Sequence, residues 1–374
     1  MFLQIHTLVS YPASLLNRDD AGLAKRIPFG NATRLRISSQ CLKRHWRDSL
    51  QENLPDIPDG LRTRHFFTRI VFPRVMAANI AEDSARKLTE ALANTVITGG
   101  MKELDMSQPV LFGSREADYF VALIQGAVIA QPDNPLDALK KRLSDKSEKE
   151  NLKAMSKSAA GLTSALFGRF VTSDLLARVD APVHVAHAMT VHAANTEMDY
   201  FTVVDDLSSD DETGAAHANQ AELGAGVFYG YVVVDVPLFI SNLTGCGEKE
   251  WKNQDSQTPQ RVLNSLIRII ASKSPGAKLG STAPYSRAET VLLEVGREQP
   301  RTLANAFLEA MPMKEHLVRQ ATVRMRDYLM RIDEMYGQTS IFRTLATIHK
   351  DVDFNISNSS LDTAASSAIK AIWS

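Results

Sequence analysis

Hydrophobic and polar residues alternate with a period of two over residues 34–37, Arg-Leu-Arg-Ile, which is typical of a half-buried strand. Ser38 and Ser39 follow with hydroxyls that suit a helix N-cap. From Leu42 to Leu50 every fourth residue is apolar, so one helical face packs against a core. The opposite face carries Gln40, Lys43, Arg44 and Arg47. The pattern predicts a strand and a capped helix whose exposed face is cationic.

The same patterning predicts helices and strands along the rest of the chain. Residues 2–9 are expected to form an opening strand, and helices are expected at 73–94, 114–130 and, with a mixed charge run, 136–157. Further strands are predicted at 165–170, 183–192, 200–204, 227–236 and 290–295. Further helices are predicted at 261–272, 302–311 and 313–336. The Ser- and Thr-rich tail after residue 337 is assigned no element.

Length and charge limit the kind of partner. At 374 residues the chain exceeds the usual size of one small domain, and 44% apolar with 23% charged residues is ordinary for a soluble globular protein. The net charge of −1 gives no global attraction for a polyanion. Because charges more than about 8–10 Å apart are screened, a polyanion site has to be a local patch. Residues 17–47 provide one, with eight Lys or Arg against two Asp.

This basic stretch has two interpretations. A helix that begins at serines directs its positive dipole end toward neighbouring cations, which suits a phosphate. The alternative is a solvated basic helix face. A second polar and basic cluster upstream favours the phosphate interpretation. It comprises Asn17, Arg18, Lys25 and Arg26.

Catalytic and metal-binding motifs are mostly missing from the sequence. Cys41 and Cys246 have no CxxC spacing, and neither a signal peptide nor a membrane span is evident, so a reducing cytoplasm is expected. No nucleotide-binding or hydrolase motif occurs. His184 and His187 would point to opposite faces of a strand, so we interpret them as structural or RNA-contacting histidines. We expect no cofactor and no bound metal.

One enzymatic alternative stays open. The pairs Asp19-Asp20 and Asp205-Asp206 are carboxylate clusters that could hold Mg²⁺ for phosphodiester cleavage. Exposed acidic loops usually need no ligand, so we favour acidic loops without a metal over a nuclease site.

Aromatic residues beside basic ones suggest binding of single-stranded nucleic acid. Arg169-Phe170 and Tyr200-Phe201 fit a combination of base stacking and phosphate contact, with core packing as the alternative. The lysines of 136–157 are interpreted as a solvated helix face, and contact with a nucleic acid strand is the minority interpretation.

Several blocks of sequence resemble a known family. They are SLLNRDD at 14–20, RLRISSQCLKRHWR at 34–47, FGRFVTSDLL at 167–176, DYFTVVDDL at 199–207 and SPGAK at 274–278. In this order they are similar to the CasC family, the backbone subunit of the type I-E CRISPR Cascade complex within the RAMP superfamily. The resemblance spans nearly the whole chain and is weakest in the helical insertion and the tail.

The resemblance implies an α+β protein shaped like a right hand. Its palm would be a modified ferredoxin-like (RRM-like) fold built from residues 1–60 and 161–374. A large helical insertion at 61–160 would form the fingers, and an extended β-hairpin at about 193–223 would form a thumb.

It also implies a non-catalytic, multi-copy subunit that binds a CRISPR guide RNA, stacks along it and presents it in segments to a target DNA strand. Implied partners are copies of itself, the large, small, guide-end-binding and guide-processing Cascade subunits, and a nuclease, with no membrane. The alternative is a metal-dependent RAMP ribonuclease that cuts target RNA.

The family contacts carry over onto matching positions. Those expected on the RNA are Asn17, Arg18, Lys25, Ser38, Gln40, Lys43, Arg44, Arg47, Arg169, Phe170, Tyr200, Phe201, Thr202 and Lys278. Phe170 replaces a methionine of the family and Tyr200 replaces a tryptophan found in many members; both keep an apolar or stacking surface.

Overall fold

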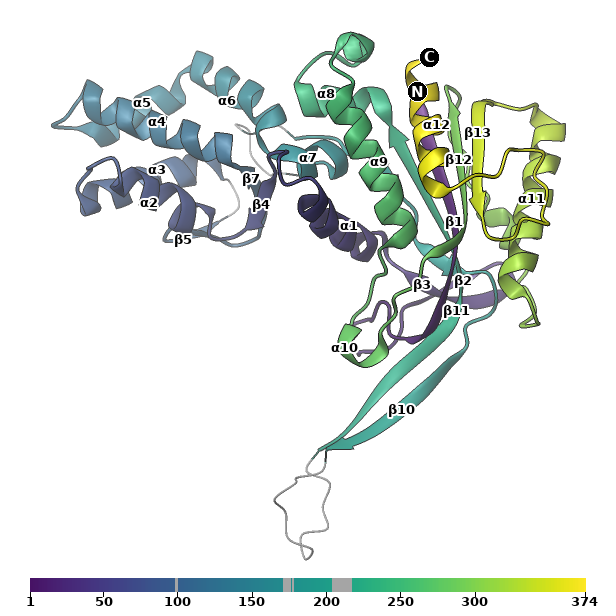
Figure 1. Cartoon of the computed structure of the whole chain (residues 1–374). Helices are drawn as coiled ribbons and strands as arrows, with labels where there is room; N and C mark the ends of the chain where they lie inside the picture. The colour runs from purple at the N-terminus through teal and green to yellow at the C-terminus, as the bar shows by residue number, and fades with distance from the viewer. Residues whose placement is uncertain (98–99, 171–175, 177, 204–216) are drawn as a thin grey trace, which may run out of the picture. The chain divides into compact units, whose positions relative to one another are not determined.

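The computed structural model describes residues 1–97, 100–170, 176, 178–203 and 217–374, which form two compact units of an α+β protein (Figure 1). The first unit comprises Met1–Asn53, His184–Val234 and Gln257–Ser374. The second comprises Leu54–Val183 and Asp235–Ser256. Residues 161–183 and 235–256, which the sequence assigned to the palm, therefore lie with the expected fingers in the second unit.

The first unit is built on one large sheet. In the described residues its order is β13 (Ser340–Thr347), β12 (Ala288–Gly296), β1 (Phe2–Ser14), β11 (His217–Asp235), β9 (Ala188–Thr190), β3 (Ala32–Ile37) and β2 (Arg26–Phe29). β10 (Thr196–Val203) and β8 (Val183–Val185) also pair with β11. β1 runs antiparallel to β12, from Phe2 opposite Gly296 to Val9 opposite Ala288. The start of β1 thus lies beside the end of β12, and its far end leads into residues 15–25.

Helices cover both faces of this sheet (Figure 1). One face carries α1 (Ser39–Asn53), α9 (Gln257–Ser272) and α12 (Leu361–Trp373). The other carries α11 (Leu317–Tyr336) and the short η3 (Ala304–Phe307). Successive side chains of β1 point to opposite faces of the sheet, so the strand contributes to both helical layers. Leu8 joins the core beneath α11, and its neighbour Val9 lines the small cavity beneath α1 and α9.

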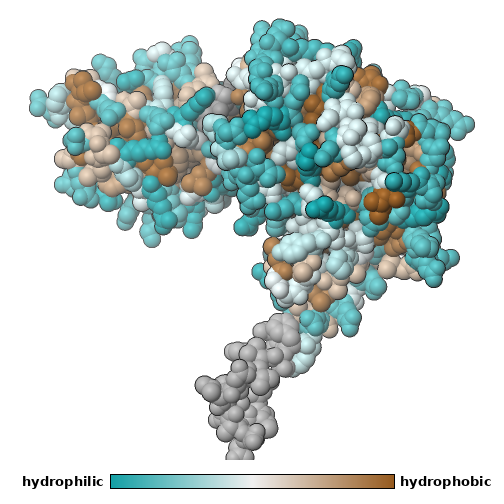
Figure 2. Space-filling model, in the orientation of Figure 1, coloured by the Kyte–Doolittle hydropathy of each residue, from teal (hydrophilic) through white to brown (hydrophobic). Residues whose placement is uncertain are grey.

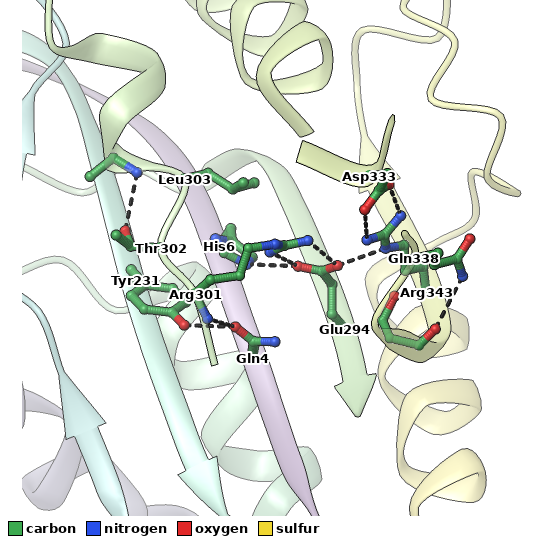
Figure 3. A network of polar contacts seen from close by, with 12 residues as sticks. Gln4, His6, Tyr231, Glu294, Arg301, Thr302, Leu303, Asp333, Gln338 and Arg343 are labelled. Atoms are coloured by element: carbon green, nitrogen blue, oxygen red, sulfur yellow. Dashed lines mark hydrogen bonds and ion pairs between the residues drawn. The ribbon is translucent and has the colours of Figure 1, made fainter. Parts of the chain in front are cut away.

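The face beneath α11 contains a buried polar network (Figure 3). Glu294 of β12 is fully buried and accepts hydrogen bonds from Arg301 and Arg343. His6 of β1 lies 3.1 Å from Glu294 through Nε2 and 2.8 Å from the Tyr229 hydroxyl through Nδ1. Burial lowers the pKa of His6 despite the carboxylate, so the ring is neutral at pH 7. The network ties strands of the sheet to the segment before η3.

A long antiparallel hairpin extends from the sheet. β10 and β11 pair from Thr196 opposite Gly224 to Val203 opposite His217 (Figure 1). The sequence predicted strands at 200–204 and 227–236, and β10 and β11 confirm both. The tip itself, with the Asp205-Asp206 pair, lies outside the described residues.

The second unit is mainly helical. Its described helices are η1 (Phe67–Val71), α2 (Phe72–Met76), α3 (Glu82–Val96), α4 (Ser114–Ala130), α5 (Pro135–Ser144), α6 (Lys146–Ala159), α7 (Gly161–Phe167), α8 (Val236–Thr244) and η2 (Glu248–Asn253). Two short hairpins accompany them, β4 (Gly60–Thr63) with β7 (Val110–Gly113) and β5 (Met101–Lys102) with β6 (Asp105–Met106). Its core centres on four phenylalanines. These are Phe66, Phe67, Phe112 and Phe120.

Several sequence predictions of elements are wrong, each for a local reason. The helix expected at 73–94 is two helices, because Asn79 takes a left-handed backbone conformation between them. The helix expected over 136–157 is interrupted at Asp145, which caps the start of α6. The strand expected at 165–170 is the end of α7, closed by Gly168 at φ +74°. The helix expected at 302–311 is only η3.

The C-terminal tail contains two elements that the sequence did not predict. β13 is the edge strand of the large sheet, and α12 packs against β12 and β13. Its buried side chains are mostly alanine, including Ala364, Ala365 and Ala368, which is a weak hydrophobic signal.

The exposed surface is mostly hydrophilic. Figure 2 shows hydrophobic residues on the visible face in separate patches rather than one continuous area. Within the described residues, no helix is both long and apolar enough to cross a bilayer.

Candidate nucleic-acid interface

Three segments of the first unit meet at the start of α1. Asn17 accepts the Ser38 N–H through Oδ1 at 2.9 Å and the Lys25 N–H through its carbonyl oxygen, also at 2.9 Å. The loop at 274–278 joins them, because the Ala277 N–H donates to the Leu15 carbonyl oxygen at 2.9 Å. Hydrogen bonds therefore fix the backbone around this helix start.

The predicted strand, cap and basic helix are confirmed. β3 ends at Ile37, and the Ser38 hydroxyl accepts the Cys41 N–H at 3.3 Å as a cap. Leu42, Trp46 and Leu50 are buried. On the other face Gln40 and Arg44 are exposed, and Lys43 and Arg47 are half-buried. We call this surface the basic cradle. It consists of Asn17, Arg18, Lys25, Gln40, Lys43, Arg44, Arg47 and Lys278. Ser38, which was also expected on the RNA, is buried and caps the helix.

In the part of the chain that the structure describes, four cations of the basic cradle have no carboxylate partner, whereas Arg47 lies 4.0 Å from Asp48. Among the described residues, Arg18, Lys25, Lys43 and Arg44 form no ion pair with a carboxylate. Partial burial lowers the pKa of Lys43, which is the direction expected for an amine without a counter-ion.

The equally basic helix α11 behaves differently. Its Arg319, Arg324 and Arg326 pair with Asp351, Glu309 and Asp327 respectively. Within the described ranges, four cations around the start of α1 are therefore left without a carboxylate partner, whereas three of the four arginines of α11 have one. An unmatched cluster at a helix N-terminus is suited to bind a polyanion.

Asp19 has a structural explanation. Its Oδ1 accepts the N–H groups of Ala21 and Leu23 at 3.0 and 2.9 Å, so the carboxylate closes the turn before Lys25. Asp20 is exposed beside it. No cluster of metal-ligating side chains occurs in the part of the chain that the structure describes.

The base of the β10–β11 hairpin is attached to the basic cradle. Glu222 of β11 is buried and accepts the Ala24 N–H at 2.7 Å. Its other carboxylate oxygen pairs with Arg26, which also donates to the Thr196 hydroxyl of β10 at 3.0 Å. Arg26, which the sequence placed with the basic cluster, is thus engaged by the hairpin.

Arg169 does not present its charge to solvent. Its side chain is 1% exposed, lies in the second unit and pairs with Glu116 at 2.6 Å. It also donates to the carbonyl oxygens of Leu111 and Ser156. A guanidinium enclosed in this way cannot reach a phosphate, so the expected RNA contact is corrected to a structural ion pair.

Phe170, the next residue, is 69% exposed. The Arg178 guanidinium lies 5.1 Å from the centre of its ring. Backbone hydrogen bonds between Arg169 and Val179 close the segment that carries both side chains. An exposed ring paired with a guanidinium is a stacking surface for a base. The sequence prediction missed Arg178, because it lies eight residues away in the chain.

Tyr200 lies in β10, opposite Gln220 of β11, and its side chain is 61% exposed. It lines a cavity of about 400 Å³ beside the hairpin, together with Met198 and Leu223. The side chains of Phe201 and Thr202 lie outside the described ones, so their predicted contacts stay predictions.

Two histidines near β9 form hydrogen bonds within the protein. His192 is buried; Nδ1 donates to the Ala193 carbonyl oxygen and Nε2 accepts the Val227 N–H. Burial lowers its pKa, which keeps the ring neutral. His187 hydrogen-bonds Arg36.

Comparison with known families and structures agrees with this geometry. The family model of the CT1975-like protein matches residues 3–373. The chain belongs to the CT1975-like protein family. The family resemblance predicted from the sequence blocks is thereby confirmed.

Solved structures show the same fold as this family member. One, a chain of a "CRISPR RNA-guided surveillance complex, pre-nicking", has a TM-score of 0.81 at 26% identity, with 100% of both chains covered. Another, from a "CRISPR RNA-guided surveillance complex", has a TM-score of 0.64 at 22% identity and covers 99% of both chains. No curated protein matches the chain.

Proposed function

We propose that this protein is a non-catalytic backbone subunit of a Cascade-type CRISPR surveillance complex and that several copies bind one guide RNA through its phosphates. The observation that carries the proposal is the cluster of Arg18, Lys25, Lys43 and Arg44 at the start of α1, which has no ion pair with a carboxylate among the described residues. The family and the two related complexes support the assignment to a Cascade-type subunit. In this proposal the first unit is the palm, the second the fingers, and the β10–β11 hairpin the thumb.

The cradle suits a guide RNA because a guide has to keep its bases available for any target. Phosphate contacts and shape bind without reading sequence, and lysine, arginine and a helix N-terminus supply such contacts. If one copy neutralises about five phosphates, the log-log dependence of affinity on salt has a slope of about −3.5. Several copies on one guide multiply this effect.

The decisive variant is Lys43→Glu with Arg47→Glu. Both side chains lie on the polar face of α1, so the change reverses charge without removing core packing. We expect guide RNA to be lost from the purified protein while the thermal unfolding midpoint stays near that of the wild type. Retention of the RNA by this variant would refute the proposed cradle.

Lys140→Glu with Lys141→Glu is the matched control. These exposed lysines of α5 undergo the same change in charge. The control should keep its guide RNA. If it also weakens capture of complementary DNA, then the minority interpretation of the finger lysines as target contacts is favoured.

The remaining partners follow from the same proposal. They are a target DNA strand, further copies of this chain, the other Cascade subunits and a nuclease that performs the cleavage. To test the absence of catalysis, the assembled complex is incubated with complementary RNA and Mg²⁺. Regular cuts that disappear in Asp19→Ala, Asp20→Ala, Asp205→Ala or Asp206→Ala variants would instead establish a RAMP ribonuclease.

A further inference from the structure

Arg36 and His187 form an unusual pair at the edge of the basic cradle. Arg36 lies in β3, and His187 lies between β8 and β9; both are half-buried. The Arg36 guanidinium donates to His187 Nδ1 at 2.9 Å, and its Nε donates to the Arg26 carbonyl oxygen at 3.3 Å. The Arg36 N–H also donates to the Lys25 carbonyl oxygen at 2.8 Å, which joins this pair to the cradle loop.

The hydrogen bond fixes the protonation state of His187. A guanidinium has only N–H donors, so Nδ1 has to be the acceptor. The ring is then neutral and carries its proton on Nε2. Burial, and next the positive charges of Arg36 and Lys25, hold the pKa of His187 below its usual range. The two charged groups that act on the ring, Arg36 of β3 and Lys25 just before β2, are both cations.

No carboxylate balances this group in the described part of the chain. The nearby acid Glu222 is engaged by the Ala24 N–H and by Arg26. Arg36 instead donates to a carbonyl oxygen and to a neutral ring, both of which are weaker partners than an anion. Arg36 and the imidazole N–H therefore lie together with no carboxylate partner among the described residues, and the charge of Lys25 acts on the same ring.

We infer that Arg36, His187 and Lys25 form a further phosphate subsite for single-stranded RNA and that RNA binding there is linked to protonation of His187. The inference rests on the proposed function, because the phosphate would belong to the guide bound in the basic cradle. A phosphate replaces the ring as acceptor for Arg36, and the released imidazole takes up a proton and pairs with the same anion.

The sign of the pH effect follows from this exchange. Burial, and after it the cations Arg36 and Lys25, lower the pKa of His187 in the free protein, and a bound phosphate would raise it. Between these two values, binding takes up a proton, so affinity falls as pH rises, by at most about tenfold per pH unit and copy. Outside that range the dependence on His187 disappears.

The test measures fluorescence anisotropy of the full chain with a fluorescein-labelled single-stranded RNA of mixed sequence and spacer length. Titrations run from pH 6 to pH 8 at constant ionic strength. Wild type should bind more tightly at pH 6 than at pH 8, and His187→Gln should reduce that ratio. His184→Gln is the control, because His184 is an exposed histidine three residues away; it should keep the wild-type ratio. Equal ratios for wild type and His187→Gln would overturn the inference.

A second measurement tests the arginine. Arg36→Gln should make the salt slope shallower by about 0.7, the amount for one phosphate contact with a single strand. Arg36→Lys should show the wild-type salt slope but not the wild-type pH dependence. Lysine keeps the positive charge but lacks the guanidinium that hydrogen-bonds His187. Arg297→Gln, exposed just after β12 beside the other end of β1, should keep the wild-type slope.

The outcomes separate this inference from the proposed function. If wild type binds RNA with a steep salt dependence while the Arg36 and His187 variants match it, the subsite is refuted and the basic cradle stands. If wild type does not bind the RNA at any pH in the range, the proposed function itself fails.

Discussion

Arg34 and Arg36 are two residues apart in β3, yet they have different roles. Arg34 is fully buried and donates to the carbonyl oxygens of Phe29, Thr190 and Phe307. Arg36 reaches the cradle edge. The sequence showed both as one basic run, because alternation reveals the face of a strand but not what covers it. Which arginine is structural depends on the segment around Phe307, far away in the chain.

Arg34→Met should therefore destabilise the protein. The change leaves carbonyl oxygens buried without a donor, and we expect a loss of about 3 kcal/mol in the free energy of unfolding. Urea denaturation followed by circular dichroism measures it. Arg297→Met, at an exposed position, should stay within about 0.5 kcal/mol of wild type. Equal midpoints for both variants would contradict a structural role for Arg34.

His6 should make stability depend on pH. Its pKa in the folded protein lies below the unfolded value near 6.5, so the unfolded chain binds a proton first as pH falls. The contribution is complete above about pH 7 and declines below 6.5. In His6→Gln the urea midpoint should change less between pH 7.5 and pH 5.5 than in wild type. An identical decline in both proteins would exclude His6 as a source.

At the scale of elements, the sequence predicted those helices whose signals lie within one short segment and missed those that depend on distant parts of the chain. The start of α1 was predictable because Ser38 and the four-residue apolar spacing up to Leu50 are contained in one short segment. α12 was missed because its buried face is largely alanine, whose pattern is weak until β12 and β13 cover it. The burial of Arg169 was equally invisible, because Glu116 lies 53 residues before it.

The cap of α1 can be tested alone. Ser38→Ala removes the acceptor for the Cys41 N–H and should lower the free energy of unfolding by about 1 kcal/mol. Ser39→Ala is the matched control, because its hydroxyl only approaches the Gln40 side chain at 3.4 Å. Thermal melts compare the two. If Ser39→Ala lost more stability than Ser38→Ala, then Ser39 rather than Ser38 would be the N-cap of α1.

At the scale of the whole molecule, the proposal depends on the β10–β11 hairpin reaching another copy. Replacing residues 200–220 by an Asn-Gly turn joins strands already paired at Asp199 and Ala221. The shortened monomer should fold and still bind RNA through the basic cradle, although it loses the predicted contacts of Tyr200, Phe201 and Thr202. It should form fewer copies per guide. Electron microscopy and sedimentation of the co-expressed complex measure this. An unchanged length of the assembly would contradict the proposed thumb.

The Glu222 contact couples the β10–β11 hairpin to the loop that carries Lys25. One buried carboxylate fastens the hairpin base to Ala24 and Arg26, next to the segment that would contact RNA. A neighbour that immobilises the hairpin would also restrain that segment and reduce the entropy lost when RNA binds there. Growth along the RNA should then be cooperative between nearest neighbours, with partly coated guides scarce at low protein concentration. In this proposal Glu222 would transmit the effect of a neighbouring copy to the RNA-binding segment, because it joins the hairpin to Ala24 and Arg26.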